Sequence, residues 1–149
     1  MSRKNIFVVA MLIIYTGGLY VFYWLARCAF LLCNEKFIGK KTPAILLIVL
    51  WSVDVVGVFS LFSSKPSNIF EARQQIVVGF YLMIVPVLYS YWYLFTASRQ
   101  IALSISKIAS DMGKLGICSV GLATWLALAG ASPIYLQICI NRLLAKNEE

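Results

Sequence analysis

Long apolar runs separated by short polar segments dominate the chain. These runs predict four membrane-spanning helices, over residues 6–27, 44–62, 76–96 and 115–138. Each run is close to the roughly 20 residues that a helix needs to cross the hydrocarbon core of a bilayer. We therefore expect an all-α polytopic membrane protein with one integral membrane domain over residues 1–149.

A different pattern follows the third run. Over residues 98–113, apolar side chains recur at helical spacing, at Ile101, Ile105, Ile108 and Met112. A polar stripe that includes Gln100, Ser104 and Lys107 runs beside them. The pattern predicts an amphipathic interfacial helix, or a continuation of the third span beyond the membrane. It does not distinguish a lipid-facing helix from a partner-facing one.

Glycine, proline and alanine mark local features of the predicted spans. Gly17-Gly18 predicts a bend or a close helix approach, and Pro86 predicts a kink in mid-span because it removes a backbone donor. Ser132-Pro133 is typical of a helix start, or of a kink in a continuing span. Alanines spaced four residues apart, Ala123, Ala127 and Ala131, favour close helix packing.

Composition supports the membrane class. Hydrophobic residues make up 61% of the 149 residues and charged residues 13%, about half the charge of a typical soluble domain. The net charge of +7 comes from basic residues placed singly or in pairs between apolar runs. This distribution suits anionic headgroups, including those of a lipid ligand, and argues against nucleic-acid binding. Basic residues divide almost evenly between the two sides, so the orientation stays open.

Residues for metal binding or catalysis are scarce. The chain has no histidine, and its four cysteines form no C-x-x-C pair, so we expect no metal site. Cys28 and Cys118 could lie on the same side of the membrane, which leaves a disulfide open, although buried thiols are the commoner case. No Ser-His-Asp, Cys-His or phosphate-loop pattern is present. We expect a protein without enzymatic activity or cofactor.

Asp54 is the most informative single residue, because it lies in mid-span. An acid there costs roughly 2.5–3.5 kcal/mol on insertion scales and usually turns inward. We expect it to be neutral, or hydrogen-bonded to another helix through Thr124 or a tyrosine. It either fixes helix packing or handles protons or cations.

Two further groups are candidate sites. Aromatic residues gather before Arg27 at the end of the first span, among them Tyr20, Tyr23 and Trp24. They predict an interfacial belt with a snorkelling arginine, or a packed cluster that fixes the following turn. Near the other end of the chain, Gln137 and Asn141 lie one helical turn apart and predict a polar face.

The same residues carry a family resemblance. Residues 16–24, Thr-Gly-Gly-Leu-Tyr-Val-Phe-Tyr-Trp, are followed by Asn34-Glu35, and the last helix reads Tyr-Leu-Gln and Ile-Asn at residues 135–137 and 140–141. The chain resembles an uncharacterised family of small bacterial inner-membrane proteins, defined as a domain of unknown function, with the signature T-[LG]-G-[IL]-Y-x-x-Y-W. Gly17 departs from the more usual leucine, and Asp54 is not part of the signature. The resemblance implies a multi-span helical fold in a bacterial inner membrane and no transferable activity.

These observations predict a protein that acts through protein–protein contacts in the bilayer. Its partners would be membrane lipids and either another membrane protein or further copies of itself. An accessory subunit and an immunity protein against a membrane-acting toxin are two forms of this function. The alternative is a small oligomeric channel or transporter in which Asp54 lines a polar path.

Overall fold

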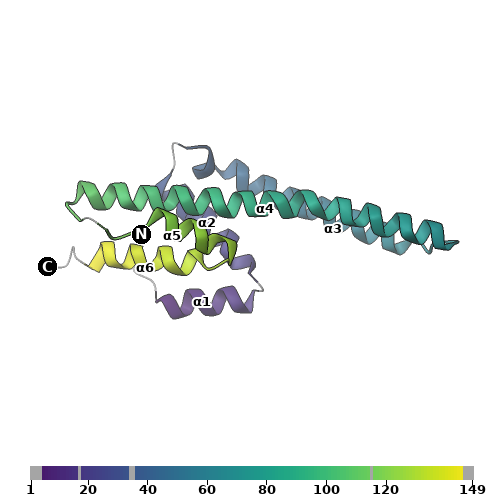
Figure 1. Cartoon of the computed structure of the whole chain (residues 1–149), viewed down its shortest axis with the longest axis horizontal. Coiled ribbons are helices and arrows are strands. Elements are labelled where there is room, and N and C mark those ends of the chain that lie inside the picture. The colour runs from purple at the N-terminus through teal and green to yellow at the C-terminus, as the bar shows by residue number, and fades with distance from the viewer. Residues whose placement is uncertain (1–4, 17, 34–35, 115, 146–149) are drawn as a thin grey trace.

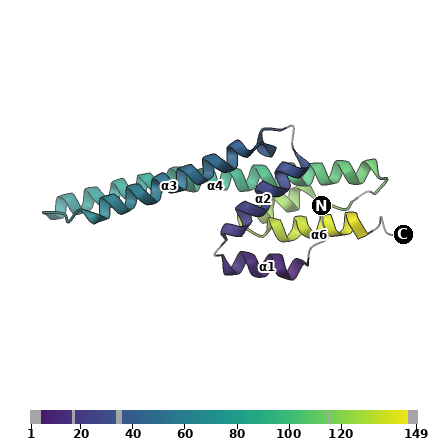
Figure 2. The same cartoon turned by 180° about the vertical axis from the view of Figure 1, so that it is seen from behind.

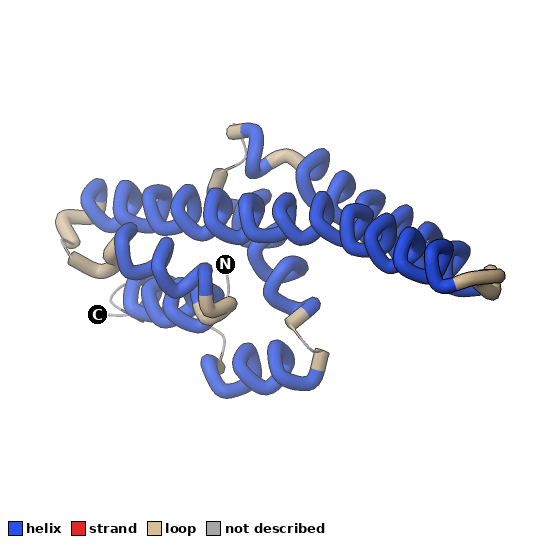
Figure 3. Tube along the Cα trace, turned by 45° about the vertical axis from the view of Figure 1, so that its right-hand side comes forward, coloured by secondary structure: helices blue, strands red, loops and turns tan. Residues whose placement is uncertain are grey.

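The described part of the chain is entirely helical. The computed structural model describes residues 5–16, 18–33, 36–114 and 116–145, which contain helices and no strand (Figure 3). In chain order the elements are α1 (Ile6–Tyr15), α2 (Leu19–Leu32), the 3-10 helix η1 (Phe37–Gly39), α3 (Lys41–Ser63), α4 (Ile69–Asp111), α5 (Val120–Leu128) and α6 (Ser132–Ala145). The all-α prediction is confirmed.

The molecule has two parts, which share the helix α4. The first half of α4 runs antiparallel to α3, and the two helices project well beyond the other elements (Figure 1). We call α3, the turn at residues 64–68 and residues 69–90 of α4 the arm. The second half of α4 packs against α2, α5 and α6, and α1 packs on α2 and α6. We call these helices the body; Figure 2 shows α2 crossing it at a steep angle.

The first predicted span is divided into two helices. The Thr16 hydroxyl donates to the Leu12 carbonyl at 2.7 Å, and the Tyr20 N–H donates to Thr16 Oγ1 at 3.0 Å. Gly18 then has a φ of +92°, in the left-handed region that a side chain disfavours. Residues 6–27 therefore form α1 and the first part of α2. The neighbouring Gly17, which the sequence also singled out, lies outside the described residues.

The last predicted span is also divided. Gly130 has a φ of +67°, and α6 begins two residues later with Ser132 and Pro133. Proline is well suited to a first helical turn, where its missing N–H has no intrahelical acceptor. Ser132-Pro133 is therefore a helix start in this structure, and residues 115–138 do not form one continuous helix.

The third span and the amphipathic segment form one helix. α4 continues through Pro86 and on through residues 98–111 without interruption. Ile101 and Ile105 are fully buried in the body. The apolar stripe of this segment therefore faces other helices of the same chain, and the separate interfacial helix expected from the pattern is not present.

The body has a core of small and aliphatic side chains with two large aromatics. The buried residues include Trp24 and Leu25 of α2, Tyr93 of α4, and a further set of Ala29, Ala97, Ile101, Ala123, Leu136 and Cys139. Ala123 and Ala127 are both buried, as their spacing predicts. None of the four cysteines, all in described parts of the chain, forms a disulfide, so Cys28 and Cys118 are not linked.

Among the described residues, two helices, α3 and α4, are long and apolar enough to cross a membrane, which weakly suggests membrane association. The other described α-helices have 9 to 14 residues, fewer than the roughly 20 that a crossing requires. The four predicted crossings are therefore not confirmed.

Candidate functional site

Asp54 lies on the face of α3 that packs against α4 inside the arm. Its side chain is only 4% exposed, and its Oδ1 atom is buried without a hydrogen-bond partner. The expected contact with Thr124 is not formed, because Thr124 belongs to α5 in the body and donates to its own Val120 carbonyl at 2.7 Å. A buried carboxyl oxygen without a partner costs free energy, so Asp54 is the least satisfied polar group of the arm.

Contacts on either side of Asp54 show which residue of α4 lies opposite it. One turn before it, the Trp51 Nε1–H donates to Ser90 Oγ at 2.9 Å; one turn after it, Gly57 faces Leu82. In an antiparallel pair, Asp54 therefore lies level with Pro86, halfway between these contacts. The Ser90 hydroxyl also donates to the Pro86 carbonyl at 2.7 Å. A short polar chain thus crosses the helix pair beside the buried acid.

Aromatic and basic residues surround the base of the arm. The Tyr89 hydroxyl donates to the Pro43 carbonyl at 3.1 Å, and its ring lies 5.2 Å from that of Trp92. Trp92 also contacts Phe37 of η1, with ring centroids 6.4 Å apart. Lys40 directly precedes α3, and Lys41 is the first residue of that helix. This arrangement is typical of an interfacial belt, in which rings and lysines lie at the headgroups.

The tip of the arm is polar and well capped. The Asn68 side chain accepts the Glu71 N–H at 2.9 Å, and the Glu71 carboxylate accepts the Ser67 N–H and hydroxyl, both at 2.7 Å. This reciprocal pattern resembles a capping box and satisfies donors at the start of α4. The Gln75 amide also donates to Ser64, which ties the turn to the following helix.

The aromatic cluster predicted near Arg27 is divided between core and surface. Trp24 is buried in the body, whereas Tyr23 and Arg27 are exposed. Tyr20 is half-buried against the core and its ring lies 5.9 Å from that of Tyr23. Because α2 presents these side chains in several directions, they do not form one site.

Gln137 and Asn141 are brought together as predicted. The Gln137 side-chain amide donates to Asn141 Oδ1 at 2.8 Å. Gln137 is buried in the body, and Asn141 is half-buried. The hydrogen bond lies within α6, and because Gln137 is buried, this face is only partly open to a partner.

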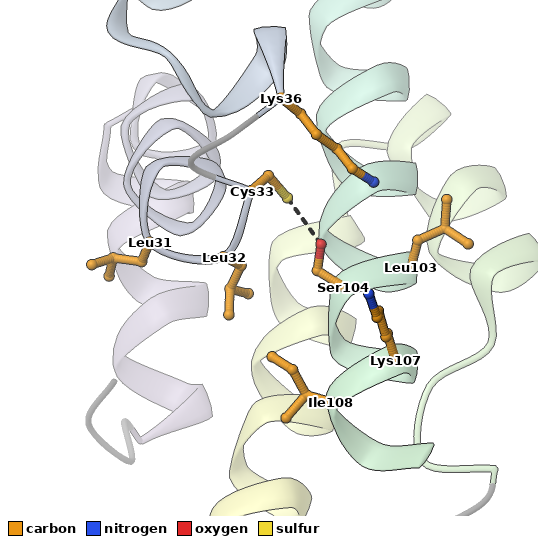
Figure 4. Close-up of a pocket in the computed structure, with 8 residues that line it drawn as sticks. All are labelled: Leu31, Leu32, Cys33, Lys36, Leu103, Ser104, Lys107 and Ile108. Atoms are coloured by element: carbon orange, nitrogen blue, oxygen red, sulfur yellow. Dashed lines mark hydrogen bonds between the residues drawn. The ribbon is translucent and has the colours of Figure 1, made fainter. Parts of the chain in front are cut away.

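A pocket that the sequence did not reveal lies between the end of α2 and the second half of α4. It has a volume of about 620 Å³ and is lined by Leu31, Leu32, Cys33, Lys36, Leu103, Ser104, Lys107 and Ile108 (Figure 4). The Cys33 thiol lies 3.1 Å from the Ser104 hydroxyl. Only the α4 half had a signal in the sequence, the polar stripe of residues 98–113. The residues that face this stripe lie about seventy positions earlier in the chain, so only the tertiary structure brings the two sets together.

Comparisons of the chain with protein-family models, curated proteins and solved structures find no match. The family resemblance drawn from residues 16–24 and 135–141 stays a prediction. Its Asn34-Glu35 pair lies outside the described residues.

Proposed function

We propose that the protein is a multi-pass protein of a bacterial inner membrane, without enzymatic activity, that binds another membrane protein inside the bilayer through its arm. The observation that carries this proposal is that the outer faces of the arm are apolar and exposed. Its two helices cover one another along one face only, and large apolar side chains on the other faces are exposed, among them Val56 at 69% and Tyr81 at 65%.

The dimensions of the arm suit a bilayer. Pro43 to Phe62 spans about 30 Å at 1.5 Å per residue, equal to the hydrocarbon thickness. Aromatic rings and lysines lie at one end of this stretch, and the polar tip lies at the other. The whole of α4, with 43 residues, would measure about 64 Å. It is therefore about twice as long as the hydrocarbon core is thick, and the body would lie largely beyond the base of the arm.

The chemistry of the arm indicates the kind of partner. Between Thr42 and Ser64 the only charged residue is Asp54, which faces α4. A soluble partner would have to cover this whole apolar surface, whereas apolar helices of another membrane protein can replace lipid on part of it by close packing. An accessory subunit or an immunity protein against a membrane-acting toxin would use the arm in this way.

Site-specific crosslinking in native membranes tests this proposal. A photoreactive residue at Val56 or Tyr81 should give one discrete adduct with a second protein, and the same residue at buried Leu47 should give none. Lipid adducts alone at both outer positions would contradict the interaction.

Membrane crossing is tested separately, with cysteines introduced at Ser64 in the tip and Lys40 at the base. An impermeant maleimide should label them from opposite sides of the membrane. Labelling of both from the same side would contradict a crossing arm.

A second candidate function rests on the unpaired Asp54 oxygen. Several arms together could enclose a polar path, in which this carboxyl would take up and release a cation or proton. Asp54→Asn keeps the shape of the side chain and removes its carboxyl group. Proton or cation flux in liposomes that disappears in this variant, with folding intact, would favour the channel; no flux in the unaltered protein would reject it.

A further inference from the structure

We propose that the pocket between α2 and α4 binds a single-chain anionic amphiphile, with a phosphate head between Lys36 and Lys107 and its chain along the leucines. The position of the pocket relative to the bilayer rests on the crossing arm proposed above, whereas its chemistry does not.

Charge indicates the head of the ligand. Figure 4 shows the ammonium groups of Lys36 and Lys107 on either side of the Ser104 hydroxyl. The eight described residues that line the pocket include no acidic side chain, and neither lysine forms an ion pair with a described carboxylate; Glu35, next to Lys36, lies outside the described residues. Two cations that share a pocket repel one another, and an anion between them removes this repulsion. A phosphate accepts hydrogen bonds from both ammoniums and from a hydroxyl.

The walls indicate an apolar tail. Leu31, Leu32, Leu103 and Ile108 line the pocket beside the polar groups, and Leu31 and Leu103 are exposed. The volume of about 620 Å³ falls in the range of small-molecule sites, roughly 300–1,000 Å³. A free phosphate would leave most of this space and its apolar wall uncovered. An acyl or alkyl chain would cover both.

Distance from the membrane selects a single-chain ligand. Ser104 lies twelve residues beyond Trp92, about 18 Å along α4, whereas the headgroup layer is only about 5–8 Å deep on each side. A lipid would have to rise out of the bilayer, and each CH₂ that leaves the hydrocarbon costs about 0.8 kcal/mol. Single-chain amphiphiles bind membranes marginally and reversibly, whereas two chains hold a lipid in place.

The test uses the full chain in nanodiscs of neutral phosphatidylcholine and a dodecyl phosphate that carries a photoactivatable diazirine in its chain. After irradiation, mass spectrometry should find adducts at the end of α2 and on residues 103–108 of α4. The variants Lys36→Ala and Lys107→Ala should each lower this labelling about three- to ten-fold, the range for a charge-assisted contact in a half-open pocket.

Matched controls distinguish binding of the probe in the pocket from non-specific attraction of an anionic probe to basic residues. Lys40→Ala and Lys65→Ala remove exposed lysines outside the pocket and should change its labelling less than two-fold. Equal losses in all four variants would overturn the site. Thermal melts show whether each variant is folded, and Lys36→Arg, which retains the charge, should restore most of the labelling.

Competition with unlabelled compounds identifies which kind of molecule supplies the phosphate head. Unlabelled dodecyl phosphate should displace the probe, and millimolar inorganic phosphate should not. Complete displacement by inorganic phosphate would overturn the need for a tail, and equal displacement by diacyl phosphatidic acid in the nanodisc would overturn the single-chain ligand. Adducts confined to the arm would overturn the pocket while leaving the membrane crossing intact.

Discussion

At the residue scale, Asp54 combines two features that are each unfavourable in lipid. It is the single acid in the middle of α3, and its Oδ1 atom has no hydrogen-bond donor. Its level on α4 coincides with Pro86, which cannot donate a backbone N–H to the carbonyl one turn earlier, that of Leu82. The arm therefore buries a carboxyl oxygen whose cost in free energy no described donor offsets.

Replacing Asp54 by leucine should stabilise the isolated protein. Leucine has a similar shape and removes a buried oxygen that lacks a partner, so we expect the free energy of unfolding to rise by about 1–3 kcal/mol. Unfolding of the variant and of the unaltered protein in the same detergent measures the difference, with Asp54→Asn as the polar control. A loss of stability in the leucine variant would show that Asp54 has a favourable partner.

At the element scale, side-chain contacts join helices that are distant in the chain. The hydroxyls of Ser98 on α4 and Ser132 on α6 lie 2.7 Å apart, and both residues are completely buried. This hydrogen bond holds the first residue of α6 against the long helix. It therefore fixes where α6 begins, together with the turn at Gly130.

The Ser98–Ser132 bond gives a double-mutant prediction. Ser98→Ala should lower the free energy of unfolding by about 1–3 kcal/mol, because it leaves the Ser132 hydroxyl buried and unpaired. Adding Ser132→Ala should recover most of that loss, since no unpaired hydroxyl then remains. Denaturant unfolding of the two single variants and the double variant measures the coupling. Strictly additive losses would contradict a hydrogen bond between the two residues.

At the scale of the whole molecule, the arm and the body divide the protein into a part that meets its surroundings and a part that packs on itself. The arm exposes apolar side chains on every outer face, whereas the second half of α4 buries one stripe in the body. The continuous helix α4 is common to both parts and couples their positions. A partner that binds the arm would therefore act on a surface fixed relative to the body.

A single charge should distinguish an arm in lipid from an arm in water. Val56→Arg places a cation near the middle of α3, where the cost of insertion is about 2.5–3.5 kcal/mol. We expect most of this variant to leave the membrane fraction or to be degraded. Ser64→Arg adds the same charge at the polar tip and should fractionate like the unaltered protein. Equal fractionation of both variants, with Val56→Arg stable, would contradict a lipid-facing arm.

How far the sequence predicts the fold depends on the range of the interactions involved. Apolar runs and periodicity correctly indicated an all-α chain, the helix over residues 44–62 and the amphipathic stripe after residue 98. The breaks at Gly18 and Gly130 were harder to predict, because a glycine in an apolar run is compatible with a continuous helix as well as with a turn. Only the folded neighbours decide between these two conformations.

The candidate sites differ in the same way. Gln137 and Asn141 share one helix face as predicted, because they lie one turn apart on one helix, a local relation. Asp54 faces α4, and the Cys33 thiol contacts the Ser104 hydroxyl. Both relations depend on how separate helices pack. The pocket could not be found from sequence, since neither of its halves is a site alone.

Helical class and apolar character follow from the sequence by itself, because they depend on composition and on periodicity within single segments. Tertiary structure alone decided that α3 and α4 form a projecting arm, that the amphipathic stripe faces the chain's own helices, and that two lysines share one pocket. The physical reason is that these features arise from contacts between residues far apart in the chain, and local propensity does not encode such contacts.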